Sequence, residues 1–143
     1  MEILDHYGIE CKGKKAVVIG RSLVVGKPAA MMLMQKNATV TICHTRTVNT
    51  AEICKNADII VSAAGVLNSL TADYVRPGQI VIDVSMNWNP EKITSKGKGG
   101  MSGDAIFDEV EPIVEAITPV PGGVGAVTTT VLMKHVVEAA EKI

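Results

Sequence analysis

AVVIGRSLVVGKP, residues 16–28, is the stretch of sequence that decides the fold. Its first four residues are apolar and stop at Gly20, which is typical of a buried strand, and Pro28 near the start of the next apolar segment is typical of the first turn of a helix. Folds that bind dinucleotides hold the pyrophosphate at such a strand-to-helix turn, because unpaired amides at a helix N-terminus carry partial positive charge. We therefore interpret the segment from Gly20 to Gly26 as a phosphate-binding loop.

The loop departs from the usual glycine pattern of these turns. Ser22 and Val25 stand where the second and third glycines of G-x-G-x-x-G would be, so the motif alone is a weak signal. Ser22 could donate its hydroxyl to a phosphate or cap the following helix. The alternative is an ordinary strand-to-helix turn in which Gly20 serves only the backbone geometry.

Strand and helix patterns alternate along the rest of the chain. Apolar runs predict strands at residues 16–20, 38–43, 58–63, 79–84, 101–106 and 115–120. Helices are expected at 1–8, 28–35, 49–55, 109–114 and 128–142, with a helical turn at 71–74, a loop or exposed hairpin at 88–100 and a glycine-rich loop at 121–125. This alternation predicts one α/β domain over residues 1–143, a Rossmann-like, doubly wound and mostly parallel sheet with helices on both faces.

The end of the second predicted strand carries information about the cofactor. Folds that select NAD usually have Asp or Glu there to bind the ribose 2'-hydroxyl. This chain has His44, Thr45 and Arg46 instead. A cation and hydroxyls suit a 2'-phosphate, and arginine can bind phosphate through two parallel hydrogen bonds, so NADP is favoured. The alternative is that Arg46 is a solvated loop charge.

Composition excludes several other classes of protein. Lys and Arg total 14 against 15 Asp and Glu, which is unlike a nucleic-acid binder, and no apolar run has the length of a membrane span. The three cysteines have no CxxC spacing and suit reduced thiols in a cytoplasmic protein. The carboxylates of Asp83, Asp104 and Asp108 are scattered along the sequence and form no recognisable metal-binding pattern, so no metal is expected.

Four segments together resemble the FolD family, the bifunctional methylenetetrahydrofolate dehydrogenases and methenyltetrahydrofolate cyclohydrolases. Residues 18–28 resemble the family's GRSxxVGKP signature, and residues 118–125 are similar to its PVPGGVGPMT stretch. ATVTICH at 38–44 and VIDV at 81–84 agree as well. Ala126 stands where the family usually has proline, so we expect a less rigid loop there.

The resemblance implies roles for individual residues. The cofactor would be bound by Gly20, Arg21, Ser22, Val25, Gly26, His44, Thr45, Arg46 and Met86. Among these, Gly20 to Ser22 would contact the phosphates, Thr45 and Arg46 the ribose and its 2'-phosphate, and Met86 the nicotinamide end. The folate cleft would be faced by the loop that contains Pro121, Gly122, Gly123 and Val124.

The resemblance also implies a missing half. Family members carry a YxxxK tyrosine and lysine in an N-terminal domain, whereas Tyr7 and Tyr74 are followed four residues on by Cys11 and Gly78. We therefore expect no catalytic residue in this chain and folate binding only together with the N-terminal domain. In the full-length family we expect a cytoplasmic homodimer of one-carbon metabolism that serves purine biosynthesis. Without its partner domain, an apolar stripe of Ile3, Leu4 and Tyr7 and part of the last helix should be exposed.

Two other interpretations remain open at the level of sequence. The chain could be a stand-alone nucleotide-binding module that associates with a partner protein and catalyses nothing. It could also be the cofactor domain of a dehydrogenase of another class, one acting on amino or hydroxy acids, although residues 119–125 argue against this.

Overall fold

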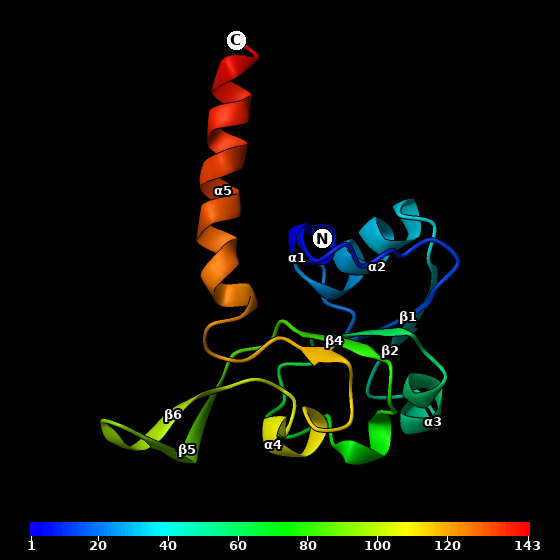
Figure 1. Cartoon of the computed structure of the whole chain (residues 1–143), viewed down its shortest axis with the longest axis vertical. Coiled ribbons are helices and arrows are strands. Elements are labelled where there is room, and N and C mark those ends of the chain that lie inside the picture. The colour runs from blue at the N-terminus through cyan, green and yellow to red at the C-terminus, as the bar shows by residue number, and fades with distance from the viewer.

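A five-stranded parallel sheet forms the centre of the computed structural model, which describes all 143 residues (Figure 1). The strands lie in the order β2-β1-β3-β4-β7. Their bounds are β1 Lys15–Ile19, β2 Thr39–Cys43, β3 Ile59–Ser62, β4 Ile80–Asp83 and β7 Ala116–Ile117. The chain adds β2 on one side of β1 and then returns to add β3 on the other side. This is the arrangement of a doubly wound sheet, which confirms the expected Rossmann-like α/β class.

The strands are apolar on both faces because helices cover both. Val18 lies in a core cluster with Leu33 and Leu4, while Val17, its neighbour in β1, lies in a second cluster with Cys54 and Val110. Successive side chains of a strand point to opposite faces, so the unbroken apolar run of β1 supplies both cores. The continuous apolar pattern in the sequence therefore has a direct structural cause.

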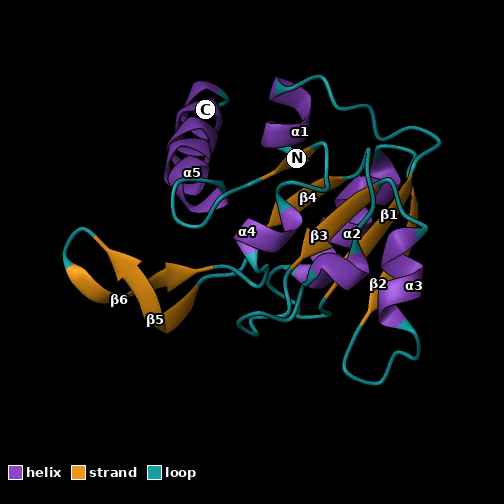
Figure 2. Cartoon of the chain, turned by 60° about the horizontal axis from the view of Figure 1, so that its bottom comes forward, coloured by secondary structure: helices purple, strands orange, loops and turns teal.

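Apart from the last helix, the helices divide between these two faces (Figure 2). The first face is covered by α1 (Glu2–His6) and α2 (Gly26–Gln35). The second is covered by α3 (Thr50–Lys55), the 3₁₀ turn η1 (Ala72–Tyr74) and α4 (Phe107–Val110). Helices on both faces are thus confirmed, and α4 replaces the helix expected at 109–114.

A two-stranded antiparallel hairpin projects from the sheet (Figure 2). It consists of β5 (Asn87–Thr94) and β6 (Gly97–Ser102), so the hairpin alternative for residues 88–100 is confirmed. The strand expected at 101–106 is wrong. Met101 and Ser102 pair within the hairpin, Ala105 makes only an isolated bridge with Leu70, and the sheet edge beside β4 is occupied by β7.

The last helix, α5 (Val124–Glu141), begins four residues before the expected start at residue 128. Gly125, expected in the glycine-rich loop, lies in the first turn of this helix, where a glycine is tolerated at a modest cost. Ala126 therefore lies in the helix and not in the loop, and its N–H donates to the oxygen of Gly123 at 3.1 Å. None of the helices, α5 included, combines the length and the apolar character needed to cross a membrane.

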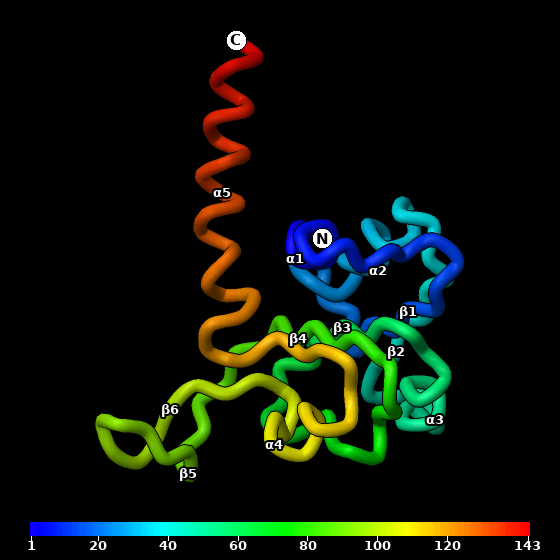
Figure 3. The backbone as a smooth tube through the Cα atoms, viewed as in Figure 1, coloured from blue at the N-terminus to red at the C-terminus, as the bar shows by residue number.

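Helix α5 stands clear of the sheet and has no buried residue (Figures 1 and 3). It runs past α1, where Lys134 pairs with Glu2 at 3.4 Å, and Leu132 is 62% exposed. The expected exposure of part of the last helix is therefore confirmed. The expected stripe at the N-terminus is only partly right, because Tyr7 is exposed but Leu4 is buried in the core against the sheet.

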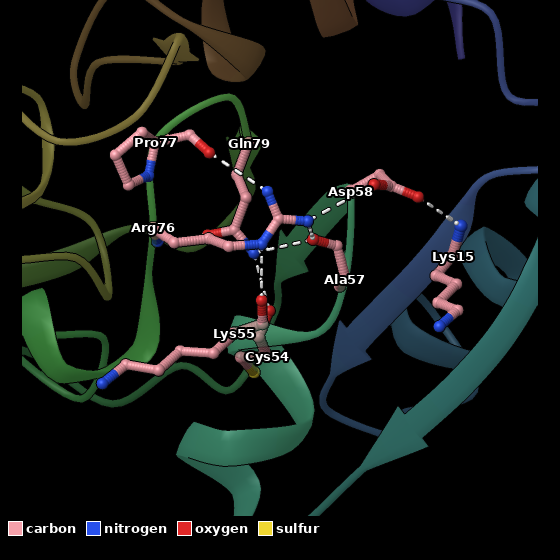
Figure 4. Close-up of polar contacts among 8 residues, drawn as sticks. All are labelled: Lys15, Cys54, Lys55, Ala57, Asp58, Arg76, Pro77 and Gln79. Carbon is pink, nitrogen blue, oxygen red and sulfur yellow. Dashed lines mark hydrogen bonds and ion pairs between the residues drawn. The ribbon is translucent and has the colours of Figure 1, made fainter.

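A polar network secures the N-terminal edge of the sheet (Figure 4). The buried Gln79 amide donates to the oxygens of Cys54 and Ala57 at 2.7 and 2.8 Å, and its own oxygen accepts from the Arg76 N–H at 2.6 Å. The Arg76 guanidinium donates to the oxygen of Lys55 at 2.7 Å, so it caps the end of α3. These contacts lie at the strand ends opposite the predicted site.

Candidate functional site

The carboxyl ends of β1, β2 and β3 meet where the strand order reverses. Open α/β sheets bind their ligands in the crevice at this position. The loop after β1 and the turn after β2 start side by side there, because the Gly20 N–H donates to the oxygen of Cys43 at 2.8 Å. The fold thus brings together the phosphate loop and the turn around Arg46, which are separated in sequence.

Two glycines let the phosphate loop pass tightly between strand and helix. Gly20 has a φ of +122°, and a Cβ atom there would lie 2.2 Å from the oxygen of Ala63. A Cβ on Gly26 would lie 2.3 Å from the oxygen of Gly20. Close helix–strand packing is the task of the third glycine in the usual motif. The usual motif has its third glycine at position 25, which is Val25 here. In this chain Gly26, one residue later, provides the close packing.

The first amides of α2 are already paired, which corrects the sequence-based expectation. The Ser22 hydroxyl oxygen accepts from the N–H groups of Val25 and Gly26 at 3.0 and 3.2 Å. The Lys27 N–H donates to the backbone oxygen of Ser22 at 3.0 Å, and Pro28 has no N–H to offer. Ser22, three residues before the N-cap residue Val25, therefore occupies the first amides of α2, and an anion cannot rely on the amides of the helix itself.

Donors remain in the loop that precedes the helix. The backbone N–H groups of residues 21–24 donate to no other group of the chain, and all four residues are exposed. The Ser22 oxygen accepts twice, which leaves its own proton available for donation. Consecutive free amides beside a glycine turn form a concave anion-binding surface. The free donors of this segment therefore lie in the loop upstream of the helix and not within the helix itself.

The turn after β2 is closed by its own hydrogen bonds. The N–H of His44 donates to the Thr47 hydroxyl at 2.9 Å, and the Thr47 N–H returns a bond to the oxygen of His44 at 2.8 Å. The Arg46 N–H donates to Nδ1 of His44 at 3.2 Å. These bonds occupy the backbone and the His44 acceptor but leave the Arg46 guanidinium and the Thr45 side chain exposed. His44 therefore acts here as a turn-former.

Three cations stand at this edge without a carboxylate partner. Arg21 in the loop, Lys27 in the first turn of α2 and Arg46 after β2 are all exposed, and none enters any of the ion pairs of the chain. The family model described as "Tetrahydrofolate dehydrogenase/cyclohydrolase, NAD(P)-binding domain" matches residues 1–143. The chain belongs to this family. Its free cations and amides therefore lie in an NAD(P)-binding domain.

Individual relatives agree with this assignment. The chain is 57% identical over 141 residues to the bifunctional protein FolD of Carboxydothermus hydrogenoformans, an alignment that covers 99% of this chain and 47% of that protein. The solved structure of the bifunctional enzyme FolD from Campylobacter jejuni is 42% identical, with a TM-score of 0.89, and the match covers 99% of this chain and 48% of that one. The chain thus spans about half the length of these relatives.

A third relative has a cofactor bound. The Trypanosoma brucei methylenetetrahydrofolate dehydrogenase-cyclohydrolase, solved in complex with NADP cofactor and inhibitor, is 39% identical with a TM-score of 0.85. The match covers 94% of this chain and 46% of that one. This similarity in sequence and fold favours the FolD family over a dehydrogenase of another class.

The two buried carboxylates of the domain lie together, which the sequence did not predict. Asp83 ends β4, and Asp104 follows the hairpin; both are almost fully buried. Burial raises the pKa of the Asp83 carboxyl above its ordinary value of 3.8, while the Ala105 N–H that donates to it at 2.8 Å acts to lower it. Asp83 and Asp104, although far apart in sequence, therefore lie together in space. They bind backbone amides and hydroxyls, and no cluster of metal-ligating residues is present.

Met86, predicted to contact the nicotinamide end, lies in the loop after β4. It is the third residue after β4, and its side chain is 67% exposed at the carboxyl edge of the sheet. It lies between Ser85 and Asn87, whose side chains both point to Asp104. The segment therefore presents one free apolar side chain between two anchored ones.

The loop expected to face the folate cleft runs from β7 to α5. Pro121, Gly122 and Gly123 form this loop, whereas Val124 is already the first residue of α5. Pro121 lines a cavity of 660 Å³ together with residues of the hairpin, and Gly122 and Gly123 line a cavity of 520 Å³ together with Tyr7. The Lys92 ammonium of the hairpin donates to the oxygen of Val120 at 3.0 Å and so joins hairpin and loop.

Proposed function

We propose that this chain binds NADP as the cofactor domain of a bifunctional methylenetetrahydrofolate dehydrogenase and methenyltetrahydrofolate cyclohydrolase. The observation that carries the preference for NADP is the unpaired guanidinium of Arg46. It stands after β2, where NAD-selective folds place a carboxylate, and the Gly20–Cys43 hydrogen bond sets this turn beside the phosphate loop. A 2'-phosphate fits this arrangement, since arginine binds phosphate strongly through two parallel hydrogen bonds.

The proposed location of the cofactor follows from the free donors. The adenosine end lies over the turn of His44, Thr45 and Arg46, and the pyrophosphate lies on the free amides of residues 21–24 and the side chains of Arg21 and Ser22. Val25 and Gly26 hold the loop in place: their N–H groups donate to the Ser22 hydroxyl, and Gly26 packs closely on Gly20. The nicotinamide end then reaches the segment around Met86.

The proposed reactions need the whole protein. NADP accepts a hydride from the one-carbon group of a methylene-folate, and the resulting methenyl-folate is hydrolysed. For the first step the domain supplies orientation, which can account for a large share of rate enhancement when two reactants must meet face to face. The groups that handle protons in the second step come, in our proposal, from the YxxxK segment of an N-terminal domain, because His44 is engaged in its turn and His135 lies exposed on α5.

We extend the proposal to the setting of the whole protein: a cytoplasmic homodimer of one-carbon metabolism that supplies purine biosynthesis. All three cysteines are free and buried, as suits a reducing compartment. The projecting hairpin exposes Trp88 and Ile93, at 64% and 77%, which suits a contact between subunits. Multi-angle light scattering of the full-length protein tests the dimer, and a monomer at micromolar concentration contradicts it.

Calorimetric titration of this chain with NADP+ and NAD+ tests the central proposal. NADP+ should bind at least about tenfold more tightly than NAD+, the equivalent of one charge-assisted hydrogen bond. Equal affinities contradict the assignment of the 2'-phosphate to Arg46, and no binding of either contradicts cofactor binding by this chain. Dehydrogenase and cyclohydrolase assays of the full-length protein test the reactions separately.

A further inference from the structure

We infer that Asp104 is a positioning residue, one that holds the two loops receiving the nicotinamide end of the cofactor. This inference rests on the proposed function. Asp104 belongs to none of the motifs that identify the family's cofactor site and lies on neither loop. It is fully buried, and each carboxylate oxygen is the meeting point of groups from different segments of the chain.

The first loop follows β3. Oδ2 of Asp104 accepts from the Ala64 N–H at 2.8 Å and from the Gly65 N–H at 3.3 Å, and Oδ1 accepts from the Val66 N–H at 2.8 Å. The hydroxyl of Ser62, at the end of β3, donates to Oδ2 at 3.0 Å. Three consecutive amides of one loop thus converge on one carboxylate, which fixes the path of the loop backbone.

The second loop follows β4. The Ser85 hydroxyl donates to Oδ2 of Asp104 at 2.7 Å, and the Asn87 amide donates to Oδ1 at 3.1 Å. The Ser85 oxygen also accepts from the Gly65 N–H at 3.1 Å, so the two loops are joined directly as well as through Asp104. The anchors stand on both sides of Met86, whose own side chain stays exposed.

The order of the strands places these loops under the far end of the dinucleotide. The turn that carries Arg46 follows β2 and the phosphate loop follows β1, and the next strands in the sheet are β3 and β4. A dinucleotide that lies across the carboxyl edge with its adenosine over β2 and its pyrophosphate over β1 therefore brings its second ring over the ends of β3 and β4. Asp104 lies beneath that position.

The site requires a carboxylate and not merely a polar group. Four of the six donors are N–H groups, from Ala64, Gly65, Val66 and Asn87, and an N–H group can only donate. An asparagine at position 104 would turn an NH₂ group toward some of these donors. The loops would lose at least one anchor without any change in side-chain volume, and an unpaired buried donor is costly.

The test compares Asp104→Asn with the original chain on two ligands. Adenosine 2',5'-bisphosphate reports only the adenosine side of the site, whereas NADPH also reports the nicotinamide side. Trp88, the only tryptophan, lies two residues beyond Met86, and energy transfer from it to the reduced nicotinamide measures where that ring lies. We expect Asp104→Asn to weaken NADPH binding by about tenfold and to reduce the transfer at saturation. The affinity for the bisphosphate should stay within about twofold.

Two further variants keep the result decisive. Ser85→Ala removes one bond to Asp104 and one to Gly65, and it should shift the same two readouts in the same direction even if Asp104→Asn does not fold. Asp73→Asn, at an exposed aspartate whose side chain has no partner, should change nothing. Equal weakening of both ligands, or unchanged transfer in the folded variants, overturns the role of Asp104. Failure of the original chain to bind either ligand overturns the proposed function instead.

Discussion

Gly26, the first residue of α2, packs directly on the backbone of Gly20, the first residue after β1. A Cβ atom at Gly26 would lie 2.3 Å from the Gly20 oxygen and 2.9 Å from the nitrogen of Arg21, so strand, loop and helix meet there without room for a side chain. This contact sets how closely α2 approaches β1. It also fixes the loop whose free amides we assign to the pyrophosphate.

Gly26→Ala should therefore destabilise the fold by about 1–3 kcal/mol, the usual cost of overpacking, and should weaken NADP+ binding. Urea unfolding and calorimetry measure the two effects. Gly125→Ala is the matched control, because a Cβ there meets no atom within 4 Å, and it should be neutral or stabilising by up to about 1 kcal/mol. Similar stabilities for the two variants would contradict the packing argument.

Arg46→Ala should weaken NADP+ binding by about 1.5–3 kcal/mol while changing the affinity for NAD+ little. The reason is that the guanidinium is exposed, has no carboxylate partner and is assigned to the 2'-phosphate alone. Titration of both cofactors gives the two affinities. Lys96→Ala, an exposed cation at the tip of the hairpin, is the control for a general loss of positive charge. An equal loss for both cofactors would remove the 2'-phosphate assignment.

Gln79→Leu should destabilise the protein by about 3 kcal/mol or more, since it removes three hydrogen bonds at once: those to the oxygens of Cys54 and Ala57 and the one from the Arg76 N–H. Cofactor affinity should hold in the folded fraction, because the network lies at the opposite edge of the sheet. Gln35→Leu, at an exposed position in α2, should change the free energy of unfolding by less than about 0.5 kcal/mol. A strong effect of Gln79→Leu on cofactor affinity would show that the two edges are coupled.

Asp83 predicts a particular dependence of stability on pH. Burial raises the pKa of its carboxyl in the folded state, so folding favours the protonated form. Its contribution to stability is then complete below the ordinary value of 3.8 and is lost as pH rises through the raised folded pKa. The free energy of unfolding of the original chain, minus that of Asp83→Asn, should therefore fall with pH from 3.8 upward and then level off. A difference that rises with pH would contradict the burial argument.

Cys54 should resist thiol reagents in the folded chain. Burial raises the pKa of its thiol to about 12, so almost no thiolate exists at pH 8 and no reagent can reach it. Mass spectrometry after brief alkylation should show Cys54 unmodified in buffer and modified in urea. An exposed thiol introduced by Ser95→Cys at the hairpin tip supplies the positive control. Rapid modification of Cys54 in buffer would show that α3 opens readily.

The fold and the cofactor class could be derived from local features of the sequence. Apolar runs predicted all five strands of the sheet, and the unbroken run at residues 16–19 predicted that β1 is buried. The start of α5 was placed too late because Gly125 continues a glycine-rich run, and only the structure shows that the turn ends at Gly123. The strand expected at 101–106 was wrong because its residues are divided between the hairpin and the anchoring of Asp104.

The sequence by itself determined the class of fold, the family and the positions of Gly20, Ser22 and Arg46, because each depends on residues that are neighbours in the chain. Only the tertiary structure decided that Ser22 takes the first amides of α2 and that the free donors lie upstream of the helix. Only the tertiary structure, too, brought Asp104 to the loops after β3 and β4, up to 40 residues earlier in sequence. The donors that surround Asp104 come from segments that the strand order brings together. Strand order is set by tertiary packing, so it cannot be derived from residues that are neighbours in the chain.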